Sequence, residues 1–80
     1  MWWLSFADGG VYIMGSEASS LAHARTLAII KGLGRASEIE GGHFISPRHA
    51  ELIPEGWIGR KLLPSEGQRL REMLGYTTPR

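Results

Sequence analysis

The alternation of side chains in the first fifteen residues predicts a β-hairpin. In the first run, Trp2, Leu4 and Phe6 alternate with Trp3, Ser5 and Ala7. In the second run, Val11 and Ile13 alternate with Tyr12 and Met14. A period of two places each set on one side of a strand. Asp8-Gly9-Gly10 separates the two runs, and glycine accepts the positive φ that tight hairpin turns need. We therefore expect antiparallel strands over residues 2–7 and 10–14.

The period then lengthens, which predicts a helix over residues 17–33. Apolar side chains recur at helical spacing at Leu21, Ala24, Leu27, Ala28 and Ile30. Ser16 is the expected N-cap, and Gly32 and Gly34 supply the left-handed stop at the other end.

Residues 36–46 predict a second hairpin. Two short runs, 37–40 and 43–46, flank Gly41-Gly42, and a pair of glycines suits a two-residue turn. Both runs are less apolar than those of the first hairpin. We therefore expect them to have one solvated face or to lie at the edge of the sheet.

The pattern of residues 47–63 leaves helix, strand and loop open. Ser46-Pro47 suits a helix start, with the serine as cap and the proline in the first turn, and would point Ala50 and Ile53 inward. Pro54-Glu55-Gly56 predicts a turn. Residues 57–63 are compatible with a short strand.

The chain is expected to finish with a helix and a loose end. Ser65 and Gln68 have the spacing of a capping box, in which each side chain bonds the other's free amide. Gly75 ends this helix, and residues 76–80 are predicted to form a flexible tail. The elements together predict a single α+β domain over residues 1–75. It is a small antiparallel sheet built from two hairpins, with one central helix and a C-terminal helix packed on it.

The composition is that of a small globular domain. The 80 residues are 42% hydrophobic, carry a net charge of +1 and include no cysteine. The core must therefore be thin and without disulfides, which fits a reducing compartment. The apolar start, Met1 to Leu4, has no basic flank and is interrupted by Asp8, so we expect neither a targeting segment nor a membrane span. The expected location is cytoplasmic.

No pattern of side chains demands a catalytic chemistry. The glycine spacing over residues 10–15 resembles a phosphate-binding loop but lacks its lysine. Glu38 and Glu40 are interpreted as solvated carboxylates rather than an acid–base pair. His43 and His49 lack the i, i+4 pairing of helical metal sites. We therefore expect a protein that is not an enzyme, with no catalytic residues, metal or cofactor.

The adjacent tryptophans, Trp2 and Trp3, are the most informative feature for function. Neighbouring strand residues point to opposite faces, so a single layer of helices buries only one of them. We expect Trp2 to be buried on the face of Leu4 and Phe6, which leaves Trp3 exposed as a contact residue. The alternative is that helices cover both faces of the sheet.

The leading hypothesis is a non-enzymatic protein–protein interaction module, such as a small regulator, inhibitor or accessory subunit. It would act through an exposed sheet face or edge, on another protein chain or on its own copy, and not on a membrane. The expected interface residues are Trp3, Trp57 and Tyr12, because large aromatic side chains are enriched at interfaces. The alternative is a weak nucleic-acid-binding module that uses the basic residues of segment 57–71. These residues are Arg60, Lys61, Arg69 and Arg71.

Overall fold

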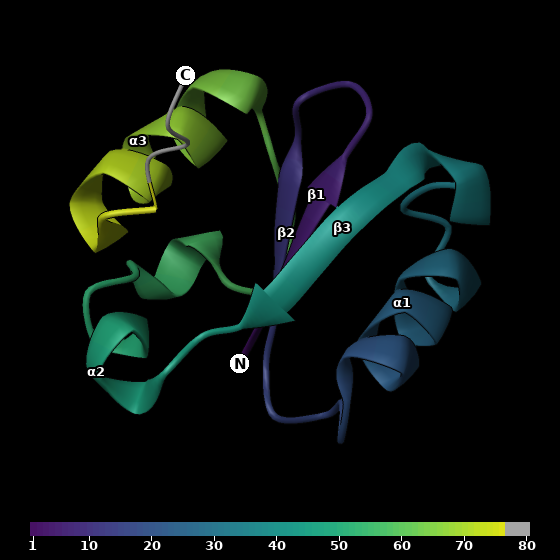
Figure 1. The fold of residues 1–80 in the computed structure, drawn as a ribbon, viewed down its shortest axis with the longest axis horizontal. Coiled ribbons are helices and arrows are strands. Elements are labelled where there is room, and N and C mark those ends of the chain that lie inside the picture. Colours follow the sequence, from purple (N-terminus) through teal and green to yellow (C-terminus); the bar gives the residue numbers. More distant parts are fainter. Residues whose placement is uncertain (77–80) are drawn as a thin grey trace.

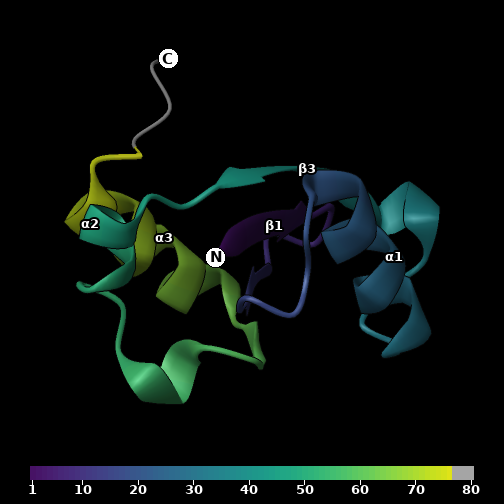
Figure 2. The same cartoon turned by 90° about the horizontal axis from the view of Figure 1, so that it is seen from below.

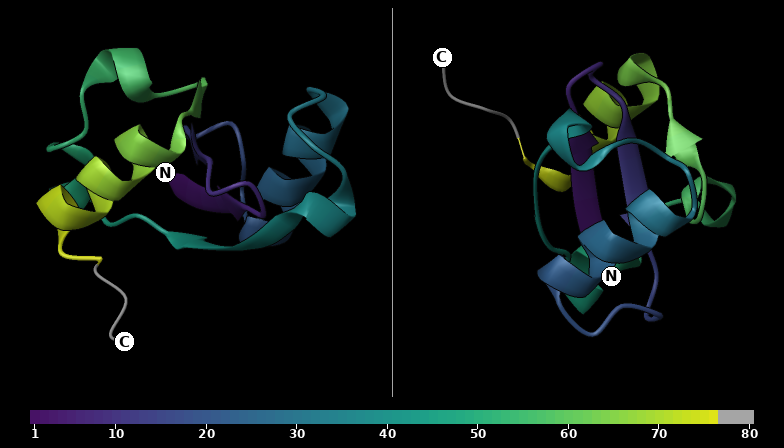
Figure 3. Two further views of the ribbon diagram at one scale, coloured as in Figure 1. Left: turned by 90° about the horizontal axis from the view of Figure 1, so that it is seen from above. Right: turned by 90° about the vertical axis from the view of Figure 1, so that its right-hand side faces the viewer.

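A computed structural model describes residues 1–76, which form a four-stranded antiparallel sheet with helices on both faces (Figure 1, Figure 2). The strand order is β3-β1-β2-β4, with β1 at Trp2–Phe6, β2 at Val11–Met14, β3 at Ile39–Phe44 and β4 at Lys61–Leu62. The helices are α1 at Leu21–Ile30, α2 at Pro47–Ala50 and α3 at Pro64–Leu74. Helix α1 lies on one side of the sheet and α2 and α3 lie on the other (Figure 3). The predicted α+β fold class is confirmed.

The first hairpin is confirmed. Strands β1 and β2 are antiparallel, with Trp2 opposite Met14 and Ser5 opposite Val11. Gly9 has a φ of 87°, and the amide of Gly10 donates to Oδ1 of Asp8 at 2.7 Å. The turn between the strands therefore has the conformation that only glycine adopts without strain.

The prediction of a second hairpin with a turn at Gly41-Gly42 is wrong, because these two glycines lie inside strand β3. This strand runs antiparallel along β1, with Trp2 opposite Phe44 and Ser5 opposite Gly41. A Cβ at Gly42 would collide with the backbone carbonyl of Trp3 and would lie 2.9 Å from Cδ1 of Leu21. Glycine is required here by the close approach of β1 and α1, not by a turn.

Both faces of β1 and β2 are buried. On the α1 side the core contains Leu4, Phe6, Tyr12, Met14, Ala24 and Ala28. On the α3 side it contains Trp3, Val11, Ile13, Leu62, Leu70 and Leu74. Because α1 and α3 cover opposite faces, alternate residues of each strand enter separate cores. The expectation that Trp3 is exposed and Trp2 is the buried indole is therefore wrong. Trp3 is 2% exposed, whereas Trp2 is partly exposed.

Helix α1 begins later, and helix α3 earlier, than the sequence predicts. Helix α1 starts at Leu21, and the hydroxyl of Ser20, not Ser16, accepts the amide of His23 at 3.1 Å. Helix α3 starts at Pro64 with Leu63 as its N-cap. The predicted capping box of Ser65 and Gln68 is therefore wrong. Instead, the carboxylate of Glu66 accepts the amide of Leu63 at 3.0 Å.

Residues 47–63, for which the sequence leaves helix, strand and loop open, contain a short helix, a 3₁₀ turn and a two-residue strand. Ser46 caps α2 and Pro47 is its first residue, as predicted, and Ile53 is buried. The 3₁₀ helix η2 covers Glu55–Trp57, so of the predicted strand only β4 forms. A second 3₁₀ helix, η1 at Ala36–Glu38, leads into β3. None of the helices in residues 1–76 has the length and apolar character to cross a membrane.

Candidate functional site

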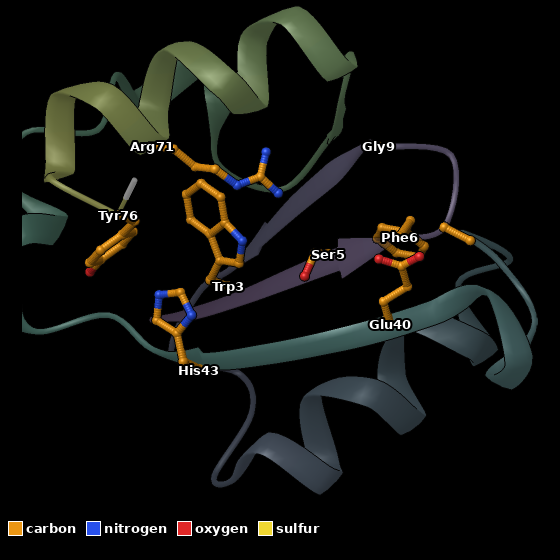
Figure 4. Close-up of a pocket in the computed structure, with 9 residues that line it drawn as sticks. Trp3, Ser5, Phe6, Gly9, Glu40, His43, Arg71 and Tyr76 are labelled. Atoms are coloured by element: carbon orange, nitrogen blue, oxygen red, sulfur yellow. The ribbon is translucent and has the colours of Figure 1, made fainter. Parts of the chain in front are cut away.

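An open pocket of about 460 Å³ lies on the α3 side of the sheet, over β1 and β3 (Figure 4). The register places Trp3 opposite His43 and Ser5 opposite Gly41, and opposed residues of an antiparallel pair share a face. Strand β3, helix α3 and the turn after β1 complete the pocket together with Tyr76, the second residue after α3. The lining residues that bear on binding are Trp3, Ser5, Glu40, His43, Arg71 and Tyr76.

Aromatic rings form one wall of this pocket. The indole of Trp3 stacks on the imidazole of His43 with 5.7 Å between ring centroids and 15° between planes. Tyr76 presents its ring at right angles to both, at 5.6 Å from Trp3 and 4.6 Å from His43. Its hydroxyl lies 2.8 Å from Nδ1 of His49. The two histidines that lack the spacing of a helical metal site therefore both contact one tyrosine.

Tyr76 is a pocket residue that the sequence does not point to, because it lies in the predicted flexible tail. Ser5, Glu40 and His43 also line the pocket without being predicted as binding residues. In the structure the amide of Tyr76 donates to the carbonyl of Arg71 at 2.7 Å, while the amide of Gly75 donates to Glu72 at 3.4 Å. This pair of bonds, with Gly75 at a φ of 76°, is the Schellman motif of a helix end. An apolar residue directly after the stop glycine commonly packs back onto its helix. That signal could have found Tyr76, and the rest of the predicted tail, residues 77–80, lies outside the described residues.

Arg71 provides the positive charge of the pocket. Its Cζ lies 5.4 Å from the ring centroid of Trp3, within range of a cation–π interaction. The side chain is half-buried, and within residues 1–76 it forms neither an ion pair nor a side-chain hydrogen bond. Its N–H groups are therefore held in the pocket wall without an acceptor from the described part of the chain.

The surroundings keep the other polar rings of the pocket neutral. Burial and then the positive charge of Arg71 lower the pKa of His43 below its ordinary value of 6.5. Burial raises the pKa of Tyr76. Among the described residues of this wall Arg71 carries the positive charge, and the acidic side chain of Glu40 lies toward the opposite end, beside Phe6 (Figure 4).

The three predicted interface residues do not form an exposed surface. Trp3 and Tyr12 are 2% and 3% exposed, on opposite sides of the sheet, so each is covered by its own chain. Trp57 is half-buried at the end of η2 and packs against the α3-side core. Trp3 nevertheless lines the pocket, as its wall rather than as a projecting contact.

The predicted basic group is also divided. Nη2 of Arg60 lies 2.7 Å from the carboxylate of Glu66, and Nζ of Lys61 lies 2.8 Å from that of Asp8. Arg69 lines a second pocket, of about 300 Å³, with Trp57. Arg71 belongs to the first pocket, so the four basic residues do not make one continuous surface.

Strand β3 presents an open edge beside the pocket. The amide of Ile45 donates to the carbonyl of Met1 at 2.8 Å. Antiparallel pairs alternate between bonded and non-bonded, so Gly41 and His43 bond to β1, whereas Gly42 and Phe44 direct their amides and carbonyls outward. Within residues 1–76 no other strand pairs with this outer edge.

Comparisons with known proteins supply no relative: no family model matches the chain, and neither does a curated protein or a solved structure. Within the described residues, no group of three or more His, Cys, Asp or Glu side chains is placed to hold a metal ion. Strand β3 supplies residues to the pocket and also carries the open edge.

Proposed function

We propose that this protein is a non-catalytic binding module that takes a segment of another protein chain as an added strand on β3. The observation that carries the proposal is the open edge of β3, where the backbone groups of Gly42 and Phe44 point away from the sheet. In this mode of recognition the main-chain hydrogen bonds provide affinity, and pockets for alternate side chains provide specificity. Such a module suits a small regulator, an inhibitor or an accessory subunit.

The contrast between the two edges of the sheet supports this assignment. Strand β4 has two residues, one of them Lys61, and Pro64 follows shortly after it. Short length, lysine and proline are the features by which proteins protect an edge from pairing. Strand β3 has six residues and contains neither lysine nor proline. The protected edge is therefore β4, and the edge available to a partner is β3.

Phe44 adds an apolar contact at the end of the open edge. Its side chain is 55% exposed and packs edge-on against Trp2, with 5.2 Å between ring centroids. An added strand would cover part of this ring. The partner can be another protein or a second copy of the chain, since an open strand edge pairs with the backbone of either.

Nucleic-acid binding through residues 57–71 has weaker support. Two of its four basic side chains, Arg60 and Lys61, are bonded to carboxylates, and Arg69 and Arg71 line different pockets. A salt titration separates the two functions. Phosphate contacts release counterions and lose affinity steeply with salt, whereas main-chain pairing does not.

The experiment is a selection of linear peptides of about twelve residues, long enough to span β3. A displayed library is selected against the immobilised protein, and the enriched peptides are titrated into ¹⁵N-labelled protein. We expect chemical-shift changes concentrated at residues 39–44. Self-association mapped to the same residues would support a second copy as the partner. Peptides that shift residues elsewhere, or no enrichment together with a monomeric protein, would overturn the proposal.

A pair of variants separates the main-chain contact from the side-chain contact. Phe44→Ala removes the ring and retains the outward amide, whereas Phe44→Pro removes both, at an edge position where proline costs no bond to β1. Strand addition predicts that Phe44→Pro weakens binding by about tenfold relative to Phe44→Ala, the effect of one lost hydrogen bond of about 1.4 kcal/mol. Equal binding by the two variants would contradict it.

A further inference from the structure

We infer that the pocket receives an acidic side chain of the bound segment, whose carboxylate pairs with Arg71. This inference rests on the proposed function, because the strand added on β3 carries the acidic residue. It goes further by assigning a chemical class to the partner. The segment recognised contains an aspartate or glutamate on the face that it shares with His43.

The state of Arg71 indicates an anionic ligand. Its guanidinium is positioned over the indole of Trp3 and is half-buried, yet no acceptor within residues 1–76 bonds to its side chain. A planar guanidinium presents two parallel N–H groups that match the two oxygens of a carboxylate. Because the aromatic ring already restrains the cation, little side-chain freedom is lost when a carboxylate binds.

The charge of the pocket favours a carboxylate over a phosphate. Among the lining residues that the structure describes, Arg71 is the one cation, and Glu40 places an acidic group toward the other end of the pocket. A carboxylate brings a single negative charge, which Arg71 balances. A phosphate brings about −1.5 to −2. The surplus negative charge would be left near Glu40.

Gly41 leaves a path from the outer edge of β3 to Arg71. It shares the pocket face with Ser5 and stands in sequence between two lining residues, Glu40 and His43. No atom lies within 4 Å of the position that a Cβ at Gly41 would occupy. Alternate side chains of an added strand lie on this same face. One of them can therefore extend over Gly41, which has no side chain of its own.

The test is a double-mutant comparison with the selected peptides. Each peptide is made with its acidic residue and with the corresponding amide, and both are titrated into the wild type, Arg71→Gln and Arg69→Gln. Arg69 is the matched control, because it lies on the same helix but lines the other pocket. We expect the amide to bind about tenfold more weakly to the wild type and to Arg69→Gln, and to bind Arg71→Gln with the same affinity as the acid.

Two further variants make the test independent of any loss of folding. Arg71→Lys retains the charge without the paired N–H groups and should show an intermediate preference for the acid. Gly41→Val narrows the path over β3 at a position where its Cβ meets no atom within 4 Å, and it should abolish the preference while leaving main-chain binding in place. Both variants are checked by the dispersion of their amide spectra before titration.

Several outcomes would overturn the inference and leave the proposed function intact. One is a set of β3-binding peptides without acidic residues. Another is an acid-to-amide change in the peptide that weakens binding to Arg71→Gln as much as binding to the wild type. Benzoate, with benzamide as its neutral control, tests a second source of the carboxylate. If benzoate shifts the resonances of the pocket residues and benzamide does not, while peptide affinity is the same with and without the acidic residue, the pocket binds a small carboxylate instead of the acidic side chain of the peptide. Loss of all peptide binding at β3 would instead remove the proposed function.

Discussion

Adding one methyl group should lower stability strongly at Gly42 and should not lower it at the adjacent Gly41. In Gly42→Ala the new Cβ meets the carbonyl of Trp3, and it lies 2.9 Å from Leu21 and 3.1 Å from Leu4. The two leucine methyls can rotate away, but the carbonyl belongs to the backbone of β1, so the two strands must separate. In Gly41→Ala the methyl group meets no atom within 4 Å.

The magnitudes follow from these surroundings. Overpacking costs typically 1–3 kcal/mol, and we expect about 3 kcal/mol for Gly42→Ala because the obstacle is backbone. A chain of 80 residues has an unfolding free energy of about 4–12 kcal/mol, so the loss is a large fraction of the total. Gly41→Ala should leave stability unchanged or raise it by about 0.5 kcal/mol, because alanine lowers the entropy of the unfolded chain.

Urea denaturation of the wild type and both variants measures the difference. The expected loss for Gly42→Ala also corresponds to a fall in melting temperature of about 4–8 °C per kcal/mol. Neither glycine has a positive φ, so a turn conformation is not the source of the effect. A Gly42→Ala variant within about 0.5 kcal/mol of the wild type, or equal losses at both positions, would refute the packing of β3 against β1 and α1.

Three further predictions concern the core, the helix caps and the pocket. Trp3→Ala should lower the unfolding free energy by about 3–5 kcal/mol, and a loss below about 1 kcal/mol in urea would contradict its burial. Ser20→Ala should cost about 1 kcal/mol, whereas Ser65→Ala should cost almost nothing, because only the first hydroxyl caps a helix; equal losses would contradict these caps. Removing the charge in Arg71→Gln should raise the pKa of His43, measured by NMR titration. Because folding lowers this pKa, the unfolded state binds more protons and stability should fall as pH decreases from 6.5; a pH-independent stability would contradict this.

Features determined by neighbouring residues could be predicted from the sequence. The hairpin over β1 and β2 follows from its alternation and from the glycines of its turn. The start of α2 at Ser46-Pro47 and the end of α3 at Gly75 depend on local backbone geometry alone. In each case the residue types are restricted by the conformation of their own backbone.

Features determined by distant packing could not be predicted in this way. Gly41-Gly42 has the composition of a turn, but its role depends on α1 and β1, which lie far away in the sequence. Likewise the alternation of Trp2 and Trp3 assigns them to opposite faces but does not say which faces the helices cover. Because α3 packs on the face of Trp3, the indole expected to be exposed is buried.

The pocket could be predicted only in fragments. The sequence points to Trp3 and to Arg71, but for different functions and different surfaces. Their meeting with His43 depends on the pairing of β3 with β1 and on the placement of α3 over that face. For Tyr76 the stop glycine predicts the end of α3. It does not by itself predict the Schellman bonds that hold Tyr76 against the helix.

Amide hydrogen exchange at residues 41–44 tests the central claim, that β3 offers its outer edge to another chain, most directly. Because Gly41 and His43 bond to β1, their amides should exchange slowly in the free protein, while those of Gly42 and Phe44 exchange quickly. A selected peptide should slow exchange at Gly42 and Phe44 and leave the other two amides unchanged. Exchange at Gly42 and Phe44 that stays fast in the complex would contradict strand addition on β3.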